Sequence, residues 1–414
     1  MAFLDHWSNW WFSRLVEGDA MRVLIVGAGI AGPTLAYWLR RSGHEPTLLE
    51  HAPEPRRGGY LVDFWGAGFD IAEWMGIVPE LMRRGYIMRE MREVRGDGRR
   101  VASIDPGDLI GLAGGRYVTI ARSDLAAVIM TAAQGLGVET IYGDTVESLH
   151  DDGDAVHATL RSGAERTFDL VVGADGLHSR VRRLAFGPDE DYERGLGIAV
   201  AAFEVDGYAP RDEDIAVAHT EVGFQALRVA LRDGATLFLI TFRHDGPIPE
   251  DDVPAQQAVL REALAGAGGE VPAILDRLAD ARTFYFDTAS QIRMPAWSAG
   301  RIALVGDAGA CPSLLAGQGS ALAMIEAYTL VRELELAGGD RIRALTAYHD
   351  RLAAMVLDKQ DAAIGLGVAF APRNGLQLVA RNTIMRMMTV PFIARLAMGR
   401  SLRDQFELVP PADG

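Results

Sequence analysis

Three glycines near the start of the chain constrain its fold more than any other feature. The segment Gly27-Ala-Gly29-Ile-Ala-Gly32 follows a β-branched, apolar run at 21–26 and opens a helical pattern over 31–41. In this motif the first glycine allows a tight turn, the second lets the backbone approach a pyrophosphate, and the third lets helix and strand pack closely. Ala31 then lies at a helix N-terminus, where free N–H groups and the helix dipole favour a phosphate. The sequence therefore predicts a βαβ unit that binds a dinucleotide.

An acidic residue at the end of the next expected strand supports the same interpretation. Strand 46–50 ends at Glu50, about 18 residues after Gly32, where a carboxylate accepts the ribose hydroxyls of an adenosine. We count His51, which follows it, among the candidate cofactor-binding residues. With strand, helix and Glu50 in register, dinucleotide binding is favoured over a purely structural βα turn.

Charge and cysteine content exclude several classes of function. The chain has 41 basic and 56 acidic residues and a net charge of -15, which argues against a nucleic-acid partner. The single cysteine, Cys311, rules out an intrachain disulfide framework and a Cys-rich metal site, and it suits a reducing cytoplasm. No apolar run approaches the ~20 residues of a transmembrane helix. We expect a cytoplasmic monomer or homodimer that is not a membrane protein.

The first 20 residues contain Trp7, Trp10 and Trp11 but no basic start and no small-residue cleavage site, which argues against a secretory signal. Leu4, Trp7, Trp11 and Leu15 fall at helical spacing. A short amphipathic helix here would dock on the body of the protein, touch a membrane or partner, or stay disordered.

The remaining pattern predicts an α/β fold, with a Rossmann-like domain, an inserted and mainly antiparallel sheet, and a C-terminal helical segment. Glycine-ended strands at 168–172 and 301–305 extend the first sheet, and a helix is expected over 123–133, capped by Ser123 or Asp124. Between them, runs of β-branched and apolar residues at 200–205, 224–231 and 235–242 indicate antiparallel strands, with a hairpin turn at 232–234. Helices are expected over 254–281 and 318–365. The expected organisation is an extension at 1–20, a first cofactor-domain part at 21–186 with loop insertions at 58–115, a substrate domain at 187–290, a second cofactor-domain part at 291–345, and helices at 346–414.

The C-terminal region carries six arginines and no acid between Asp361 and Asp404. An apolar stripe of Ile384, Met385, Met388, Phe392 and Leu396 runs through it. The stripe predicts a helix that covers the substrate domain, and a basic membrane-surface helix is the alternative.

Two later segments carry a family resemblance. Asp169 to Arg182, with Asp175-Gly176 at its centre, resembles the Asp-Gly segment of flavoprotein aromatic hydroxylases. Gly306-Asp307, followed by Gly317-Gln318-Gly319, resembles their Gly-Asp segment. In order and separation the chain is similar to the class A, single-component flavin monooxygenases of the para-hydroxybenzoate hydroxylase fold. Within that class it looks most like tetracycline-degrading and polyketide-tailoring hydroxylases, from Met21 to roughly Asp350.

The resemblance implies FAD as the cofactor and gives roles to single residues. Asp307 would accept from the ribityl hydroxyls, and the backbone N–H groups of Gly317, Gln318 and Gly319 would stabilise charge that grows on the flavin during reduction. Arg122 would reach a phosphate or the ribityl chain, and Asp175 and Arg182 would bracket FAD from the other side. The resemblance also places Arg57 and Asp63 near the isoalloxazine; a solvated basic loop is the alternative.

The sequence departs from the family after Asp307, where Ala310-Cys311-Pro312-Ser313 replaces the usual histidine-containing run. Cys311 is interpreted as a small filler near the flavin and not as a nucleophile, since no base is visibly paired with it.

The chain has one dinucleotide fingerprint, no Cys-x-x-Cys and no Trp-x-Trp-x-Ile-Pro segment, so the nicotinamide is expected to visit only transiently. The resemblance implies that NADH or NADPH reduces FAD and that O2 then gives a C4a-hydroperoxide, which hydroxylates an aromatic or polyketide-like small molecule. A flavin-containing cyclase or a dehydrogenase on the same scaffold is the alternative. We assign no catalytic residue and no metal ligand. His219, His244 and Asp63 could deprotonate a phenol, but we interpret each of them as a structural or solvated residue. Four phenylalanines of the inserted sheet, Phe203, Phe224, Phe238 and Phe242, are candidates to line an aromatic cavity.

Overall fold

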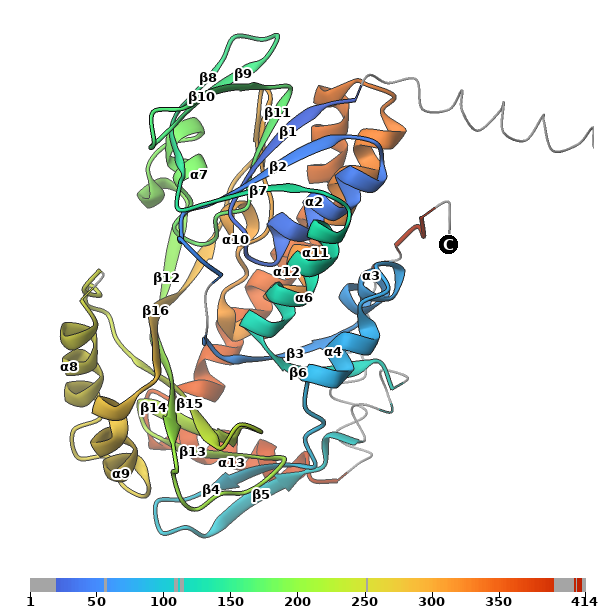
Figure 1. The fold of residues 1–414 in the computed structure, drawn as a ribbon. Coiled ribbons are helices and arrows are strands. Elements are labelled where there is room, and N and C mark those ends of the chain that lie inside the picture. The colour runs from blue at the N-terminus through green and yellow to red at the C-terminus, as the bar shows by residue number, and fades with distance from the viewer. Residues whose placement is uncertain are drawn as a thin grey trace, which may run out of the picture.

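A mostly parallel six-stranded sheet forms one half of the molecule (Figure 1). The computed structural model describes residues 20–55, 58–107, 111, 115–250, 252–390, 406 and 408–411. All neighbouring strands of this sheet are parallel except the edge pair formed by its two shortest strands. In sheet order the strands are β17 (Ser298–Ala299), β18 (Ile302–Leu304), β11 (Leu170–Gly173), β1 (Arg22–Val26), β2 (Glu45–Glu50) and β7 (Glu139–Tyr142). Segments far apart in the sequence thus share one sheet, as expected.

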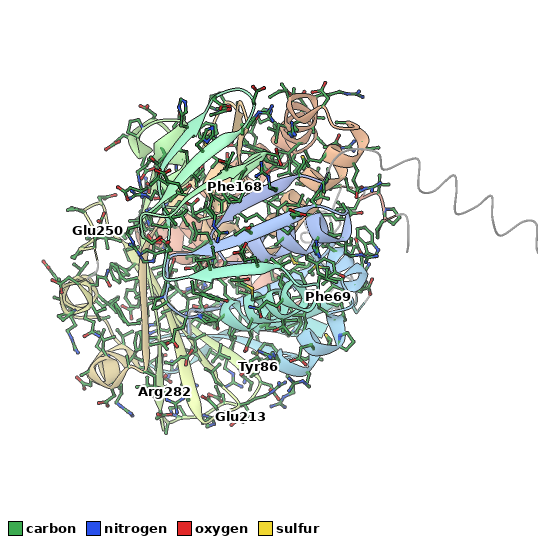
Figure 2. All side chains as sticks on the ribbon, turned by 45° about the horizontal axis from the view of Figure 1, so that its top comes forward. Phe69, Tyr86, Phe168, Glu213, Glu250 and Arg282 are labelled. Carbon is green, nitrogen blue, oxygen red and sulfur yellow. The ribbon has the colours of Figure 1, made fainter. Side chains whose placement is uncertain are left out.

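The two faces of this sheet have separate cores because side chains alternate along each strand. Val23 and Ile25 face a helical layer formed by α2 (Ala31–Arg41), α6 (Arg122–Gly135), α11 (Gly319–Leu336) and α12 (Arg341–Phe370). Leu24 and Val26 face the other side and pack with Phe168, which Figure 2 labels. That side is covered by α7 (Arg180–Ala185) and by a small antiparallel sheet of β8 (Val146–Asp151), β9 (Val156–Leu160) and β10 (Glu165–Phe168).

Two sequence predictions in this half need correction. The strand expected at 168–172 is two strands, because β10 ends at Phe168 and β11 begins at Leu170 in a different sheet. The helix expected at 123–133 begins one residue earlier, after Ala121, and no side chain caps it. Backbone contact explains the earlier start, since the N–H of Arg122 donates to the Tyr60 carbonyl at 3.1 Å. Asp124 instead pairs with Arg84 at 3.1 Å.

A seven-stranded, mainly antiparallel sheet forms the other half (Figure 1). The hairpin at 232–234 joins two of its central strands, as the sequence predicts. In sheet order its strands are β16 (Thr283–Ile292), β12 (Glu193–Asp206), β15 (Ala235–Arg243), β14 (Phe224–Ala230), β13 (Ile215–Glu221), β4 (Glu90–Val94) and β5 (Arg100–Ile104). The last two strands come from residues 90–104, a region expected to be a loop insertion of the cofactor domain. The expected fold class, α/β with an inserted antiparallel sheet and C-terminal helices, is confirmed.

One face of the second sheet carries an aromatic core. Phe203, Phe224, Phe238 and Phe242 pack with residues of α8 (Val253–Ala263) and α9 (Val271–Asp276) and are at most 5% exposed. The prediction that they line a cavity is therefore wrong. Their common face is closed by the two helices that follow in sequence, and the cavity on this face, beside α9, is lined by Ala226, Val271 and Ile274 and by none of the four phenylalanines.

The C-terminal helices cover the opposite face of this sheet (Figure 1). The helix expected over 318–365 is two helices, since α11 ends before Gly338 and Gly339, both with positive φ, and Asp340 caps α12. The final helix, α13 (Gly375–Met387), packs on β5. In the predicted stripe Met385 and Met388 are partly buried, whereas Ile384 is 59% exposed. Phe392, Leu396 and the tryptophans of the first 20 residues lie outside the described residues.

Short elements connect these layers. A two-stranded ribbon, β3 (Leu61–Trp65) with β6 (Tyr117–Ala121), lies between the two sheets, and helices α3 (Ala67–Trp74) and α4 (Val78–Arg84) pack beside it (Figure 1). Helix α10 (Asp307–Ala310) follows β18, and single turns of 3-10 helix lie at 189–191, 277–280 and 314–316. Among the described residues no helix is long and apolar enough to cross a membrane.

Candidate cofactor and substrate site

The three glycines of the first turn have different surroundings. Gly27 has φ +108, and a Cβ there would overlap the carbonyl oxygen of Ala174 on the neighbouring strand end. A Cβ on Gly32 would overlap the carbonyl of Gly27 itself. Gly29 has no heavy atom within 4 Å of its Cβ position. Two glycines therefore close the turn, and the middle one leaves open space at the start of α2, where a pyrophosphate would fit.

Glu50 holds this turn from the end of β2. Its two carboxylate oxygens accept from the backbone N–H groups of Ala28 at 2.8 Å and Ala52 at 2.9 Å. The side chain stays partly exposed beside the turn, and His51 is exposed next to it. Helix α2 has no side-chain cap, so its first N–H groups stay available to an anion.

The Gly306-Asp307 turn lies against the same glycine turn. A Cβ on Gly306, which has φ +63, would come within 3.1 Å of the Ala31 methyl group. An oxygen of Asp307 lies 3.8 Å from the Cβ position of Gly319, the first residue of α11. Gly317 has left-handed backbone and Gln318 precedes the helix without capping it by a side chain. The carboxylate and an uncapped helix start thus face one space beside α2.

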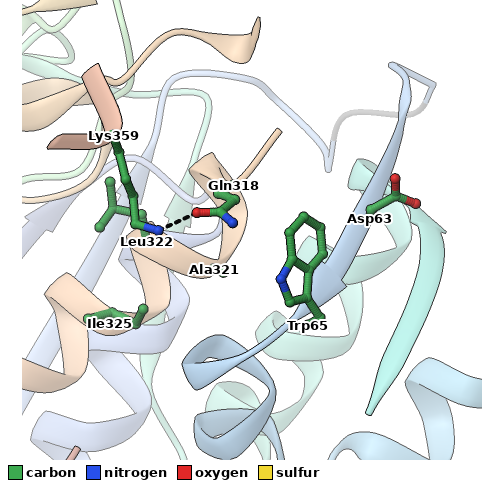
Figure 3. Close-up of a pocket in the computed structure, with 7 residues that line it drawn as sticks. All are labelled: Asp63, Trp65, Gln318, Ala321, Leu322, Ile325 and Lys359. Carbon is green, nitrogen blue, oxygen red and sulfur yellow. Dashed lines mark hydrogen bonds between the residues drawn. The ribbon is translucent and has the colours of Figure 1, made fainter. Parts of the chain in front are cut away.

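Lys359 of α12 reaches the start of α11. Its ammonium donates to the side-chain oxygen of Gln318 (Figure 3). Both line a small pocket whose opposite wall is the indole of Trp65 on β3. Asp63 also lines it, but its carboxylate accepts from the Tyr117 hydroxyl at 2.5 Å and the Thr119 hydroxyl at 2.7 Å on β6. Burial and then the Asp63 charge raise the pKa of Tyr117. Arg57 lies outside the described residues.

A polar cluster that the sequence did not reveal connects the cofactor turn to the second sheet. The rings of Tyr60 and Tyr285 are 5.6 Å apart, and the Tyr285 hydroxyl donates to Asp287 at 3.2 Å. His178 lies 3.1 Å from the same carboxylate. The pKa of Arg122 is raised, chiefly by Tyr60 and further by Asp307, although burial acts to lower it. The signal in the sequence was the spacing of Tyr285 and Asp287, since residues two apart on a strand share a face.

Asp175 and Arg182 are engaged within the protein. Asp175 accepts from the Ser179 hydroxyl at 2.5 Å and from the N–H groups of Arg180 at 2.7 Å and Val181 at 3.1 Å, at the start of α7. Burial raises the pKa of Asp175, and these hydrogen bonds lower it. The Arg182 side chain is fully buried and donates to the Ala308 carbonyl at 2.8 Å. Both residues support the turn around the cofactor space from behind.

The remaining candidates lie apart from this cluster. His219 pairs with Glu221 at 3.0 Å on the α9 side of the sheet, and His244 lies near the Pro247 carbonyl at 3.4 Å. Cys311 is buried, and burial raises the pKa of its thiol well above the usual value. A thiol of this kind is a poor nucleophile, in agreement with its interpretation as a small filler.

Comparison with known proteins assigns the chain to a family. The sequence profile described as "FAD binding domain" matches residues 20–359. A flavin-dependent monooxygenase of an unknown prokaryotic organism is 34% identical over 374 residues, covering 88% of this chain and 94% of the relative. This chain belongs to the class A flavin-dependent monooxygenases. A flavin-dependent monooxygenase of Legionella longbeachae is 32% identical over 364 residues, covering 86% of this chain and 90% of the relative.

Solved structures agree with this family. The tetracycline destructase Tet(55) superposes with a TM-score of 0.80 at 30% identity, over 94% of this chain and 98% of that one. HpxO of Klebsiella pneumoniae, in complex with FAD and uric acid, has a TM-score of 0.75 at 21% identity, over 92% of this chain and 95% of that one; this shows a shared fold. The chain is therefore an FAD-binding oxidoreductase, and the open space at Gly29, beside the uncapped start of α2, fits that cofactor.

Proposed function

We propose that this monooxygenase uses NADH or NADPH and O2 to hydroxylate an aromatic or polyketide-like small molecule. The observation that carries the proposal is the cluster of Tyr60, Arg122, Tyr285 and Asp287, which joins the Asp307 turn to the substrate sheet. A pair of aromatic rings beside a carboxylate suits a flat, hydroxylated ring. Similarity to a tetracycline destructase, 30% identical over 94% of this chain, supports the same substrate class.

The cofactor residues have separate tasks in this proposal. Glu50 takes the adenosine ribose, while the open face of Gly29 and the N-terminus of α2 take the pyrophosphate. Asp307 accepts from the ribityl chain, with Arg122 beside it. The N–H groups at the start of α11, around Gln318, stabilise negative charge at the flavin edge. FAD, when bound, supplies hydride acceptance from the nicotinamide and activation of O2.

The substrate residues lie on the face of the sheet away from the phenylalanine core. Tyr285 and Asp287 of β16 point to this side, toward Tyr60. The rings orient an aromatic substrate over the cofactor space, and the Asp287 carboxylate accepts from a substrate hydroxyl. His178, half exposed beside Asp287, then offers a position for the proton near solvent. The C-terminal helices on this face exclude water.

Substrate-dependent oxygen chemistry tests the reaction. Purified protein with FAD is mixed with NADH or NADPH and candidate phenols or tetracyclines, and oxidation of the nicotinamide, O2 uptake and product mass are followed. A hydroxylase consumes the nicotinamide and O2 in equal amounts, and it places one atom of isotopically labelled dioxygen in the product. A cyclase would leave the nicotinamide untouched, and a dehydrogenase would reduce an artificial acceptor without adding oxygen. Either of these results contradicts the proposal.

A variant of Tyr285 tests the position of the substrate. Tyr285→Leu removes a ring from the cluster, so we expect KM for an aromatic substrate to rise about fivefold, which corresponds to an aromatic contact of about 1 kcal/mol. Tyr208→Phe is the matched control, because Tyr208 packs edge-on against Phe238 on the other face of the same sheet. An equal KM in wild type and the Leu variant would place the substrate elsewhere.

A further inference from the structure

A buried carboxyl group lies directly beneath the Gly306-Asp307 turn. Glu326 projects from the second turn of α11 and is 0% exposed. One of its oxygens, Oε2, accepts from the Gly306 N–H at 2.5 Å. The other oxygen has no hydrogen-bond partner in the part of the chain that the structure describes. A carboxylate anion in this position would be poorly compensated, since burying an unpaired charge is strongly unfavourable.

The neighbours of Glu326 also favour a neutral acid. The Tyr348 hydroxyl of α12 lies 3.3 Å from Glu326 Oε2 and 3.2 Å from the Leu304 carbonyl. It carries one proton for two acceptors and cannot satisfy both at once. Ala31 of α2 contributes only a methyl group at this turn, 3.1 Å from the Cβ position of Gly306. No cation contacts this carboxyl within the described residues.

The same surroundings set its protonation. Burial raises the pKa of Glu326 to about 8; the Asp307 charge raises it too, whereas hydrogen bonds from Gly306 and Tyr348 lower it. Among the described residues Asp307 and Tyr348 are the titratable groups that act on this carboxyl. Glu326 is therefore protonated at neutral pH and ionises in mildly alkaline solution.

We propose that Glu326 is a positioning residue for FAD: as a neutral acid it holds the Gly306 N–H and thereby fixes Asp307 beside Gly319. The inference rests on the proposed contact between Asp307 and the cofactor. Ionisation adds a second negative charge next to Asp307, beneath a turn that must accommodate a cofactor carrying a diphosphate. FAD is then held less tightly, so retention of the cofactor depends on pH through a residue that does not touch it.

The test is the dissociation constant of FAD, measured on the full chain by fluorescence quenching between about pH 6.5 and about pH 9. In wild type we expect a constant value below about pH 7.5 and a rise of about tenfold at pH 9, one unit above the pKa of about 8. Glu326→Gln keeps an acceptor for Gly306 and has no charge to gain. Its dissociation constant is expected to stay within about twofold of wild type at neutral pH and to remain flat.

Glu333→Gln is the matched control. Glu333 lies two turns further along α11, is 6% exposed and accepts from Arg351 at 2.6 Å. Its variant is expected to keep the wild-type pH profile. A flat wild-type profile, or a Glu326→Gln profile as steep as wild type, overturns the proposal. The wild-type profile decides even if the glutamine variant does not fold. Failure of wild type to bind FAD near pH 7 would instead contradict the cofactor assignment itself.

Discussion

At the scale of single residues, the glycine turn separates folding from cofactor binding. Gly27 and Gly32 have no room for a side chain, because a Cβ on either would overlap backbone oxygen, whereas Gly29 has 4 Å of free space around its Cβ position. The sequence motif predicts a separate role for each of the three glycines. The structure shows that Gly27 and Gly32 close the turn and that the space beside Gly29 is open, as the predicted role of each glycine requires.

A pair of alanine variants tests this separation. Gly29→Ala is expected to leave the melting temperature of the FAD-free protein unchanged. It is expected to weaken FAD binding by about tenfold to 100-fold, because overlap of the methyl group with the pyrophosphate costs about 1–3 kcal/mol of binding free energy. Gly27→Ala is expected to destabilise the FAD-free protein by at least about 2 kcal/mol, owing to its φ of +108 and the overlap with Ala174. Thermal melts without FAD and fluorescence titrations with it give both quantities. Equal loss of stability in the two variants would contradict the assignment.

Residue chemistry was predictable from the sequence where a local motif encodes it. The close packing at Gly27 and Gly32 follows from spacing within one βαβ unit, whereas the ribose contact of Glu50 stays a prediction. Tyr60 and Tyr285 were missed, because their contact joins residues far apart in sequence. Asp175 was expected at the cofactor, which stays a prediction; its Cα lies 2.8 Å from the Cβ position of Gly27, and its carboxylate accepts from the start of α7. An Asp-Gly pair predicts a turn, and it does not say which partner the carboxylate will have.

At the scale of elements, local periodicity predicted helices and strands better than their partners. The helix at 31–41 has the predicted bounds. The glycine turn before it, its apolar face and its C-terminal end are all encoded within this short segment. Strand β4 was missed because it pairs in parallel with β13, more than 100 residues later in the chain. Alternation along a strand puts Phe238 and Phe242, four residues apart, on one face. It could not show that α8 and α9 would close this face.

One buried ion pair joins α13 to the sheet. Arg381 of α13 donates to Glu93 of β4 at 2.8 Å, and the two side chains are 8% and 2% exposed. Removing one partner leaves a buried charge, so Arg381→Met or Glu93→Gln is expected to lower the free energy of unfolding by about 3 kcal/mol. The double variant is expected to lose clearly less than the sum. Denaturant unfolding of the four proteins measures this coupling, and strictly additive losses would show that the pair does not hold the helix.

At the scale of the whole molecule, one ion pair bridges the two halves directly. His178 follows β11 of the six-stranded sheet, and Asp287 lies on β16 of the seven-stranded sheet, 3.1 Å away. The hydrogen bond to Asp287, opposed by burial, raises the pKa of His178. The bridge lies next to Tyr285, so it ties the orientation of the two halves to the site between them.

The sign of the pH dependence follows from the raised pKa of His178. The folded protein binds a proton that the unfolded chain releases near pH 6.5. The bridge therefore stabilises fully below that pH and is lost as pH rises through the folded pKa. His178→Gln is expected to lower the melting temperature at about pH 6 and to match wild type above about pH 8.5, with a loss under about 1 kcal/mol because His178 is 59% exposed. His150→Gln, an exposed residue on β8, is the control and should show no such trend. If His178→Gln lowers the melting temperature equally at both pH values, the contribution of His178 comes from packing and not from its charge, and the two halves are not coupled through this ion pair.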